Sequence, residues 1–298
     1  MDTAIGSVRV VTHRWYARGA IGAWAFLPHG EDKNHQGRWL AGGYWICMQE
    51  KPVALVTGAN QGIGLAIATD LAARGFTVLV GSRDLARGQA AAAKVAGDAR
   101  AIALDVTNAE SIAAAENRVR EEMGRLDVLV NNAGIANGGA ARATTLETIL
   151  ESGCPSRAAI SDIRAVFETN VFGVIAVTQA MLPLLCQAPA ARIVNVSSRV
   201  GSMTVISDPA YPMRRIGGVA YGPSKSALNA VTIAFAQELE GTAVKVNAMC
   251  PGLTATAFND HLGTRSAADG AREAVRLALL GPDGPTGTFS NDAGPIPW

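Results

Sequence analysis

Histidine and cysteine are scarce in this sequence, which limits the metal and redox chemistry open to it. Each occurs only four times in 298 residues, and three of the histidines precede residue 36. His261 is the single histidine left for the rest of the chain, so a histidine-based zinc site is not expected there. No two cysteines have CxxC spacing. We therefore expect reduced thiols, no metal and a cytoplasmic location.

An excess of one sign of charge and long hydrophobic runs are also missing. Lysine and arginine number 26 against 25 aspartates and glutamates, whereas nucleic-acid binding usually calls for a basic stripe. No apolar run approaches the ~20 residues of a membrane-spanning helix. We expect neither nucleic acid nor a membrane as a partner.

The composition changes near residue 48. Residues 1–47 hold four of the five tryptophans and three of the four histidines, without sustained hydrophobic periodicity. Met48 then stands directly before a regular α/β pattern. Our preferred interpretation is one domain over residues 48–298, preceded by an unstructured stretch, 1–47, that lies upstream of a natural start at Met48. A genuine N-terminal extension is the alternative.

Strands and helices alternate from Pro52 onward. Short apolar runs predict strands at 53–57, 76–80, 101–104, 128–130, 192–196, 244–248 and 286–289. Helical spacing predicts helices at 62–74, 108–123, 163–185, 224–239 and 271–280. Repeated βα units with nearly continuous apolar strands indicate a parallel sheet covered on both faces. We predict a Rossmann-type, doubly wound α/β fold of about seven strands.

A glycine-rich loop, TGANQGIG, joins the first predicted strand to the first helix. Glycine lets the backbone approach a phosphate closely, and the helix start offers free N–H groups. The GxxxGxG spacing is a weak signal alone, but its strand–loop–helix position predicts dinucleotide binding. The residues assigned to this contact are Gly58, Asn60, Gln61, Gly62, Ile63 and Gly64.

The tip of the second predicted strand bears on the choice of cofactor. There the fold presents a side chain to the adenosine ribose, and an acidic residue would favour NAD. Arg83 instead offers a charged donor fork suited to a 2′-phosphate. Asp84 follows one place later and has the position of a helix N-cap. We predict NADP (NADPH) over NAD, with NAD as the alternative.

Tyr221 and Lys225 stand four residues apart at a helix start. That spacing places both side chains on one helix face. A phenol with a pKa of about 10 is a poor base at neutral pH, and a neighbouring ammonium favours its ionised form. A tyrosine–lysine pair alone is a weak signal, because such pairs also occur on surfaces.

Other polar clusters follow the predicted strands or lie behind them. Asn131–Gly134 follows the fourth strand, Ser197 and Ser198 the fifth, and Pro251–Thr256 the sixth, while Asn170 lies in the long helix between the fourth and fifth. Open α/β sheets bind ligands at the carboxyl ends of their strands. The clusters therefore predict one site at that edge.

With these motifs, residues 52–298 resemble the short-chain dehydrogenase/reductase family, and within it the carbonyl-reductase-like branch. The resemblance implies that Tyr221 protonates the carbonyl oxygen and that Lys225 lowers the Tyr221 pKa and bonds the nicotinamide ribose. It further implies that Ser198 holds the carbonyl oxygen and that Asn170 supports a water in a proton relay. Ser197 is the alternative serine.

The same resemblance extends the cofactor site. It implies that Asp105 meets the adenine, and that the segment Pro251–Thr256 holds the carboxamide and phosphates. The residues added to the cofactor site in this way are Asp105, Val106, Asn132, Ala133, Gly134, Pro251, Gly252, Thr254 and Thr256, together with Tyr221 and Lys225.

The chain departs from the family pattern in several places. Extra residues lie at 138–161, and the interval from Ser198 to Tyr221 is longer than usual. Gln61 stands where some NADP-dependent relatives have a basic residue. Tyr211 has the usual spacing from the serine, but Arg215 follows it four places later, so Tyr221 is the better candidate. The insertion 199–220 slightly favours a monomer over a homo-oligomer.

Three functions are compatible with these motifs. We favour NADPH-dependent reduction of a ketone or aldehyde to an alcohol. An alcohol, sugar or steroid dehydrogenase working oxidatively is the alternative, with a small-molecule carbonyl or alcohol substrate in either case. A non-catalytic nucleotide sensor is disfavoured because the tyrosine, lysine and serine are all present. Substrate specificity is expected to depend on the loops 136–161, 199–220 and 253–270.

Overall fold

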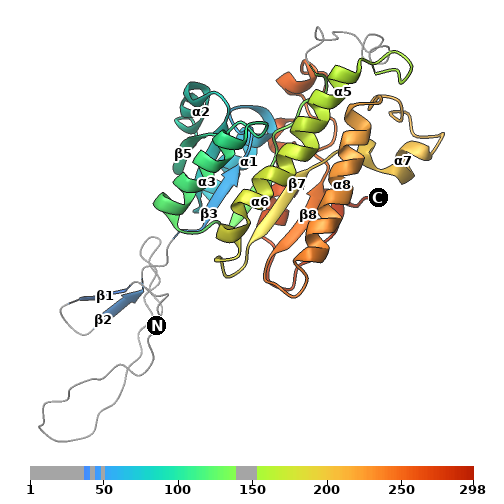
Figure 1. Cartoon of the computed structure of the whole chain (residues 1–298). Helices are drawn as coiled ribbons and strands as arrows, with labels where there is room; N and C mark the ends of the chain where they lie inside the picture. The colour runs from blue at the N-terminus through green and yellow to red at the C-terminus, as the bar shows by residue number, and fades with distance from the viewer. Residues whose placement is uncertain (1–36, 41–43, 48–50, 139–152) are drawn as a thin grey trace, which may run out of the picture. The chain divides into compact units, whose positions relative to one another are not determined.

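The computed structural model describes residues 37–40, 44–47, 51–138 and 153–298 of the chain. The chain divides into two units, Met1–Lys51 and Pro52–Trp298. In the first unit, strands β1 (Gly37–Leu40) and β2 (Tyr44–Cys47) pair antiparallel, with Gly37 opposite Cys47 (Figure 1). The second unit contains every residue assigned above to catalysis or to the cofactor.

A mostly parallel sheet forms the centre of the second unit. Its eight strands have the order β10-β9-β8-β7-β6-β3-β4-β5. They are β3 (Val53–Val56), β4 (Thr77–Ser82), β5 (Asp98–Ala103), β6 (Val128–Asn131), β7 (Arg192–Val196), β8 (Lys245–Met249), β9 (Phe289–Asn291) and β10 (Gly294–Pro295). Seven are parallel, and the two-residue β10 adds an antiparallel edge. The predicted doubly wound Rossmann-type fold is confirmed.

Helices cover both faces of this sheet. They are α1 (Gly62–Ala73), α2 (Leu85–Ala92), α3 (Ala109–Met123), α5 (Ile160–Phe167), α6 (Gly173–Leu185), α7 (Met203–Ser207), α8 (Tyr221–Glu238) and α9 (Ala267–Ala278). Side chains alternate between faces along a strand. Val53 and Leu55 accordingly join a core with α3, α6 and α8, whereas Ala54 and Val56 join a second core with α1 and α9. Burial on both faces explains the apolar strand sequences.

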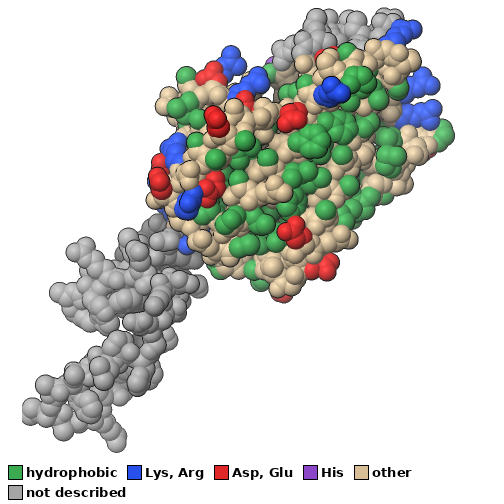
Figure 2. Space-filling model, viewed as in Figure 1, with side chains coloured by type: hydrophobic (Ala, Val, Ile, Leu, Met, Phe, Trp, Pro, Cys, Tyr) green, Lys and Arg blue, Asp and Glu red, His purple; other side chains and the backbone are tan. Residues whose placement is uncertain are grey.

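One long helix carries part of the predicted site. Helices α5 and α6 continue into each other through a π-helical turn, Glu168–Phe172, and Figure 1 shows them as a single rod. By length and composition the helix Ile160–Leu185 could cross a membrane, as buried core helices of soluble proteins also could. Val166, Val177 and Met181 lie buried on its inner side, as in a core helix. Figure 2 shows further hydrophobic side chains along its outer face.

The structure differs from the predicted elements in a few places. Helix α2 was not predicted: it is only eight residues long and rich in alanine. The last parallel strand begins at Phe289 rather than at residue 286. Helix α8 begins at Tyr221, three residues before the predicted start. Part of the predicted insertion 138–161 lies outside the described residues.

Candidate functional site

The predicted polar clusters meet at the carboxyl edge of the sheet. Strand β3 lies between β4 and β6, so the connections from β3 and β6 leave in opposite directions. Such a switch point opens a crevice outside the strand ends, where ligands of this fold bind. The glycine loop follows β3, Asn131–Gly134 belongs to the end of β6, and the two serines follow β7.

The glycine loop has a conformation that only glycine supplies without strain. Gly58 and Gly62 have φ angles of 61° and 58°. A Cβ at Gly64 would overlap the Asn132 amide and lie 2.7 Å from the Gly58 carbonyl oxygen. Helix α1 begins at Gly62, and its N-cap residue Gln61 makes no side-chain cap. The open first turn leaves backbone N–H groups for an anion.

Thr57 and Asn132 join the glycine loop to the end of β6. The Thr57 hydroxyl accepts hydrogen bonds from the backbone N–H groups of Asn132 (3.0 Å) and Ala133 (2.9 Å). The Asn132 amide donates to the carbonyl oxygens of Thr57 (2.8 Å) and Gly58 (3.1 Å). Asn132 therefore holds the loop in place. Thr57 was not predicted from the sequence as a site residue, although it directly precedes the first glycine.

Arg83 and Asp105, which follow the carboxyl ends of β4 and β5, interact electrostatically. Hydrogen bonds from Thr107 hold the pKa of Asp105 below its usual value, and the Arg83 charge adds to this effect. Arg83 is exposed at the end of β4. Asp84 accepts the N–H of Arg87 at 3.1 Å and caps α2. Neighbouring Val106 is buried.

Tyr221 and Lys225 lie one turn apart on α8. The Lys225 Nζ lies 5.7 Å from the centre of the Tyr221 ring and donates to the Val196 carbonyl oxygen at 2.9 Å. Burial raises the pKa of Tyr221, and interaction with Ser198 opposes that rise. Burial also lowers the pKa of Lys225 to about 8. Both changes follow from the loss of water around a charged form.

Asn170 anchors the start of α8 from the π-helical turn. Its amide donates to the carbonyl oxygen of Ile135 (2.9 Å) and to the hydroxyl of Ser224 (3.0 Å), and its Oδ1 accepts the Ile135 N–H (2.9 Å). The Ser224 hydroxyl in turn donates to the Tyr221 carbonyl oxygen at 2.7 Å. π-Helical turns recur at functional sites. Ser224 is a further residue that the sequence analysis missed.

The two serines after β7 have different surroundings. The Ser197 hydroxyl is buried and donates to Asn229 at 2.6 Å. Ser198 is partly exposed, and its side chain caps no helix. Its hydroxyl interacts with the Tyr221 phenol and lowers the pKa of that phenol. This arrangement favours Ser198 over Ser197. For Tyr211, burial raises the pKa and the Arg199 charge opposes the rise.

The segment after β8 faces the glycine loop. A Cβ at Gly62 would lie 3.4 Å from the Thr256 methyl carbon. Thr256 caps a short 3-10 helix, Ala257–Asn259. The Thr254 hydroxyl donates to the Pro251 carbonyl oxygen at 3.1 Å. Of the two threonines, Thr256 is therefore the one placed beside the loop.

The residues present fit a dinucleotide. The glycine loop has left-handed backbone at Gly58 and Gly62, and α1 begins there without a side-chain cap. Gly134 lies close to two residues of the predicted catalytic site. A Cβ at Gly134 would stand 3.2 Å from Asn170 Oδ1 and 3.5 Å from Lys225 Nζ. A nicotinamide nucleotide bound here would supply or accept a hydride.

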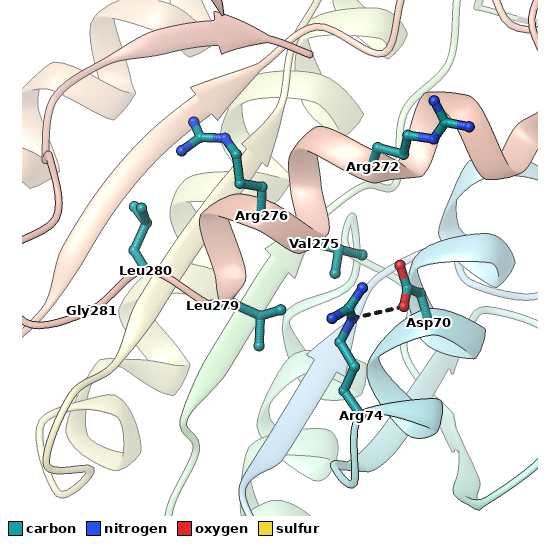
Figure 3. Close-up of a pocket in the computed structure, with 8 residues that line it drawn as sticks. All are labelled: Asp70, Arg74, Arg272, Val275, Arg276, Leu279, Leu280 and Gly281. Atoms are coloured by element: carbon teal, nitrogen blue, oxygen red, sulfur yellow. Dashed lines mark hydrogen bonds and ion pairs between the residues drawn. The ribbon is translucent and has the colours of Figure 1, made fainter.

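A separate hollow lies between α1 and α9 (Figure 3). Its volume is about 460 Å³, and it is lined by Asp70, Arg74, Arg272, Val275, Arg276, Leu279, Leu280 and Gly281. Arg74 pairs with Asp70 at 2.8 Å and Arg276 with Glu273 at 2.7 Å. These cations are neutralised locally. The hollow lies by the C-terminal turns of both helices, away from the catalytic crevice, because the N-terminus of α1 adjoins the glycine loop.

Residues 52–267 match the family model described as short chain dehydrogenase. A short-chain dehydrogenase, anuI, of Penicillium roqueforti is 37% identical over 78% of this chain and 90% of its own length. Carbonyl reductase [NADPH] 1 of Mus musculus is 34% identical over 83% of this chain and 99% of its own.

Solved structures show the same similarity. Salutaridine reductase from Papaver somniferum has a TM-score of 0.67 and 29% identity, over 81% of this chain and all of that one. The 3-ketoacyl-(acyl-carrier-protein) reductase from Brucella melitensis, complexed with NADH, has a TM-score of 0.67 and 25% identity, over 81% of this chain and 96% of that one.

Proposed function

The chain belongs to the short-chain dehydrogenase family and is an oxidoreductase of carbonyl or alcohol groups, and from that premise we propose that it reduces a ketone or aldehyde to an alcohol with NADPH. The observation that carries the proposal is the meeting of Tyr221, Lys225 and Ser198 beside a glycine-rich nucleotide cradle.

A protonated tyrosine is what the reductive direction requires. Burial raises the pKa of Tyr221, so its phenol holds a proton at neutral pH. Reduction of a carbonyl needs a proton on the new alkoxide oxygen, and a protonated phenol can donate it. Lys225, with a pKa of about 8, still carries a positive charge at pH 7 and stabilises the phenolate that remains. The oxidative alternative would begin from the ionised phenol.

Ser198 and Asn170 have distinct parts in this scheme. The Ser198 hydroxyl interacts with the Tyr221 phenol, and in this proposal it holds the substrate carbonyl oxygen. Asn170 acts through Ser224 on the first turn of α8 and is a positioning residue. The relay water implied for Asn170 stays a prediction.

Preference for NADPH rests on the end of β4. Arg83 is exposed there, and the neighbouring Asp84 is engaged as the cap of α2. Among the residues that the structure describes at that strand end, the acidic one is thus engaged and not presented to the ribose hydroxyls of NAD, whereas the Arg83 guanidinium suits a 2′-phosphate. Carbonyl reductase [NADPH] 1 of Mus musculus, whose name specifies NADPH, is consistent with this choice.

Initial rates with a panel of ketones and aldehydes, measured with NADPH and with NADH, test the proposal. We expect oxidation of NADPH that depends on a carbonyl compound, that is faster than with NADH, and that is absent from Tyr221→Phe. Activity only with alcohols and oxidised cofactor would favour the oxidative alternative. Binding of nucleotide without turnover of any substrate would reject the enzyme proposal.

The cellular setting proposed from the sequence is a cytoplasmic monomer. Cys154, Cys186 and Cys250 are all free, as in a reducing compartment. Ile160 and Phe172 on the long helix are exposed, and because a homo-oligomer would cover such apolar surface, these two side chains favour the oligomeric alternative. Light scattering after size exclusion distinguishes the monomer that we propose from a dimer or tetramer.

A further inference from the structure

The segment Leu253–Arg265 exposes more large apolar side chains than its length explains. Eight such side chains are exposed in the part of the chain that the structure describes, and three of them, Leu253, Phe258 and Leu262, lie on this segment. Exposed apolar surface is costly in water, and its concentration marks a binding surface. The segment also follows β8 directly at the catalytic edge of the sheet.

The base of the segment is tied to the rest of the domain. Thr254 and Arg265 form a parallel bridge, and the Ala255 N–H donates to the Arg265 carbonyl oxygen at 2.8 Å. The Arg265 guanidinium pairs with Asp292, with one hydrogen bond at 3.1 Å, and donates to the Asp269 carbonyl oxygen at 3.0 Å. The segment is therefore held to both α9 and the β9–β10 turn.

The tip of the segment has a specified backbone. Thr256 and Asn259 form a reciprocal capping box around the 3-10 helix that contains Phe258. Asp260 and His261 then take left-handed φ angles of 49° and 62°. A Cβ at Gly263 would overlap the backbone of Ala255. These constraints fix the position of Phe258.

Phe258 lies against the catalytic tyrosine. The centres of its ring and the Tyr221 ring are 5.6 Å apart, and the ring planes are inclined at 55°. That separation and tilt are typical of interacting aromatic pairs. Even so, Phe258 remains 47% exposed. Phe258 therefore lies one ring contact away from the residue that the oxygen of a carbonyl substrate would approach.

We propose that Phe258 is a specificity-determining residue, which selects carbonyl compounds bearing an apolar ring next to the reacting carbon. The assignment rests on the proposed reductase function. The substrate ring packs against the free surface of Phe258, and both surfaces leave water on binding.

The charges of the segment support the same substrate class. Between Leu253 and Thr264 it contains no lysine or arginine. Arg265, at the base, is paired with Asp292. A substrate with a phosphate or carboxylate at this position would therefore find on the segment only the Arg265 guanidinium, which Asp292 already neutralises, to offset its loss of hydration.

Two α-keto esters isolate this contact. Ethyl benzoylformate and ethyl pyruvate share the reacting group and differ in a phenyl against a methyl substituent. The wild type should show the higher kcat/KM for the benzoylformate. Phe258→Ala should lower that value at least tenfold, mainly through KM, and change the pyruvate value less than threefold. Phe258→Trp should retain the preference for phenyl because it keeps an aromatic face.

Controls separate this role from a structural one. Leu279→Ala removes a comparably exposed apolar side chain, 42% exposed, at the end of α9. This variant should leave kcat/KM for both esters unchanged. NADPH affinity and thermal unfolding should stay close to wild type in Phe258→Ala. Equal losses for both esters, or no loss for either, would overturn the assignment of Phe258. Failure of the wild type to reduce any carbonyl compound would overturn the proposed function itself, and the assignment with it.

Discussion

Replacing Lys225 by methionine is expected to stabilise the cofactor-free protein while removing most of its activity. The side chain is 4% exposed, and burial lowers its pKa from 10.5 to about 8. The folded state therefore holds the ammonium proton less tightly than the unfolded state does. At pH 7 this difference costs the folded state about 3 kcal/mol, at about 1.4 kcal/mol per pH unit.

The lost hydrogen bond reduces the gain. Lys225 donates to the Val196 carbonyl oxygen at 2.9 Å, and leaving that oxygen unpaired costs about 1–2 kcal/mol. A net gain of about 1–2 kcal/mol at pH 7 remains for Lys225→Met.

The pH dependence gives the sharper signature. As pH rises through the folded-state pKa of about 8, the wild-type lysine loses its proton in the folded state first, so wild-type stability rises. The advantage of the variant should therefore shrink by about 2 kcal/mol between pH 7 and 9.5.

Urea unfolding of the two proteins without nucleotide, at both pH values, measures the difference. Lys94→Met, at an exposed position, is the matched control. Its difference from wild type in the free energy of unfolding should be the same at both pH values. A Lys225→Met protein clearly less stable than wild type at pH 7, or a difference independent of pH, would refute the reasoning.

Four further substitutions, one of them a control, test the site. Tyr221→Phe should lower turnover by about 10³-fold or more with NADPH affinity retained, and Tyr211→Phe should be mild; comparable losses in the two would contradict the choice of tyrosine. Arg83→Asp should move preference toward NADH by at least tenfold, about 1.4 kcal/mol, and a wild type that already prefers NADH would rule out the Arg83 role. Gly64→Ala should weaken NADPH binding at least tenfold in a fluorescence titration, because the new methyl overlaps the Asn132 amide; unchanged binding would mean that the loop does not approach the cofactor.

Much of the fold could be predicted because periodicity and buried strands are strong signals. The predicted strand at 192–196 coincides with β7, and the predicted helix at 62–74 extends one residue beyond α1. The start of β5 was predicted too late, at residue 101, because its first three residues, Asp98, Ala99 and Arg100, are charged or small. The π-helical turn around Asn170 has no hydrophobic signature, so the long helix was predicted as uninterrupted.

The motifs of the candidate site were predicted from the sequence, but the hydrogen bonds and contacts that join them were not. The hydrogen bond from Asn170 to Ser224 joins residues 54 positions apart, and the link from Asn132 to Thr57 spans 75. The approach of Phe258 to Tyr221 likewise depends on a loop built from caps and left-handed residues. Such contacts arise from tertiary packing, which one sequence does not encode as a local pattern.

Transfer of a label from the cofactor to the substrate tests the central claim most directly. NADPH deuterated at the transferring position of C4 would be incubated with ethyl benzoylformate and the full chain, and the alcohol product analysed by mass spectrometry. Our account predicts one deuterium on the carbinol carbon, formed by the wild type and not by Tyr221→Phe. Alcohol without deuterium, or equal labelling by Tyr221→Phe, would contradict hydride transfer at the site formed by Tyr221, Lys225 and Ser198.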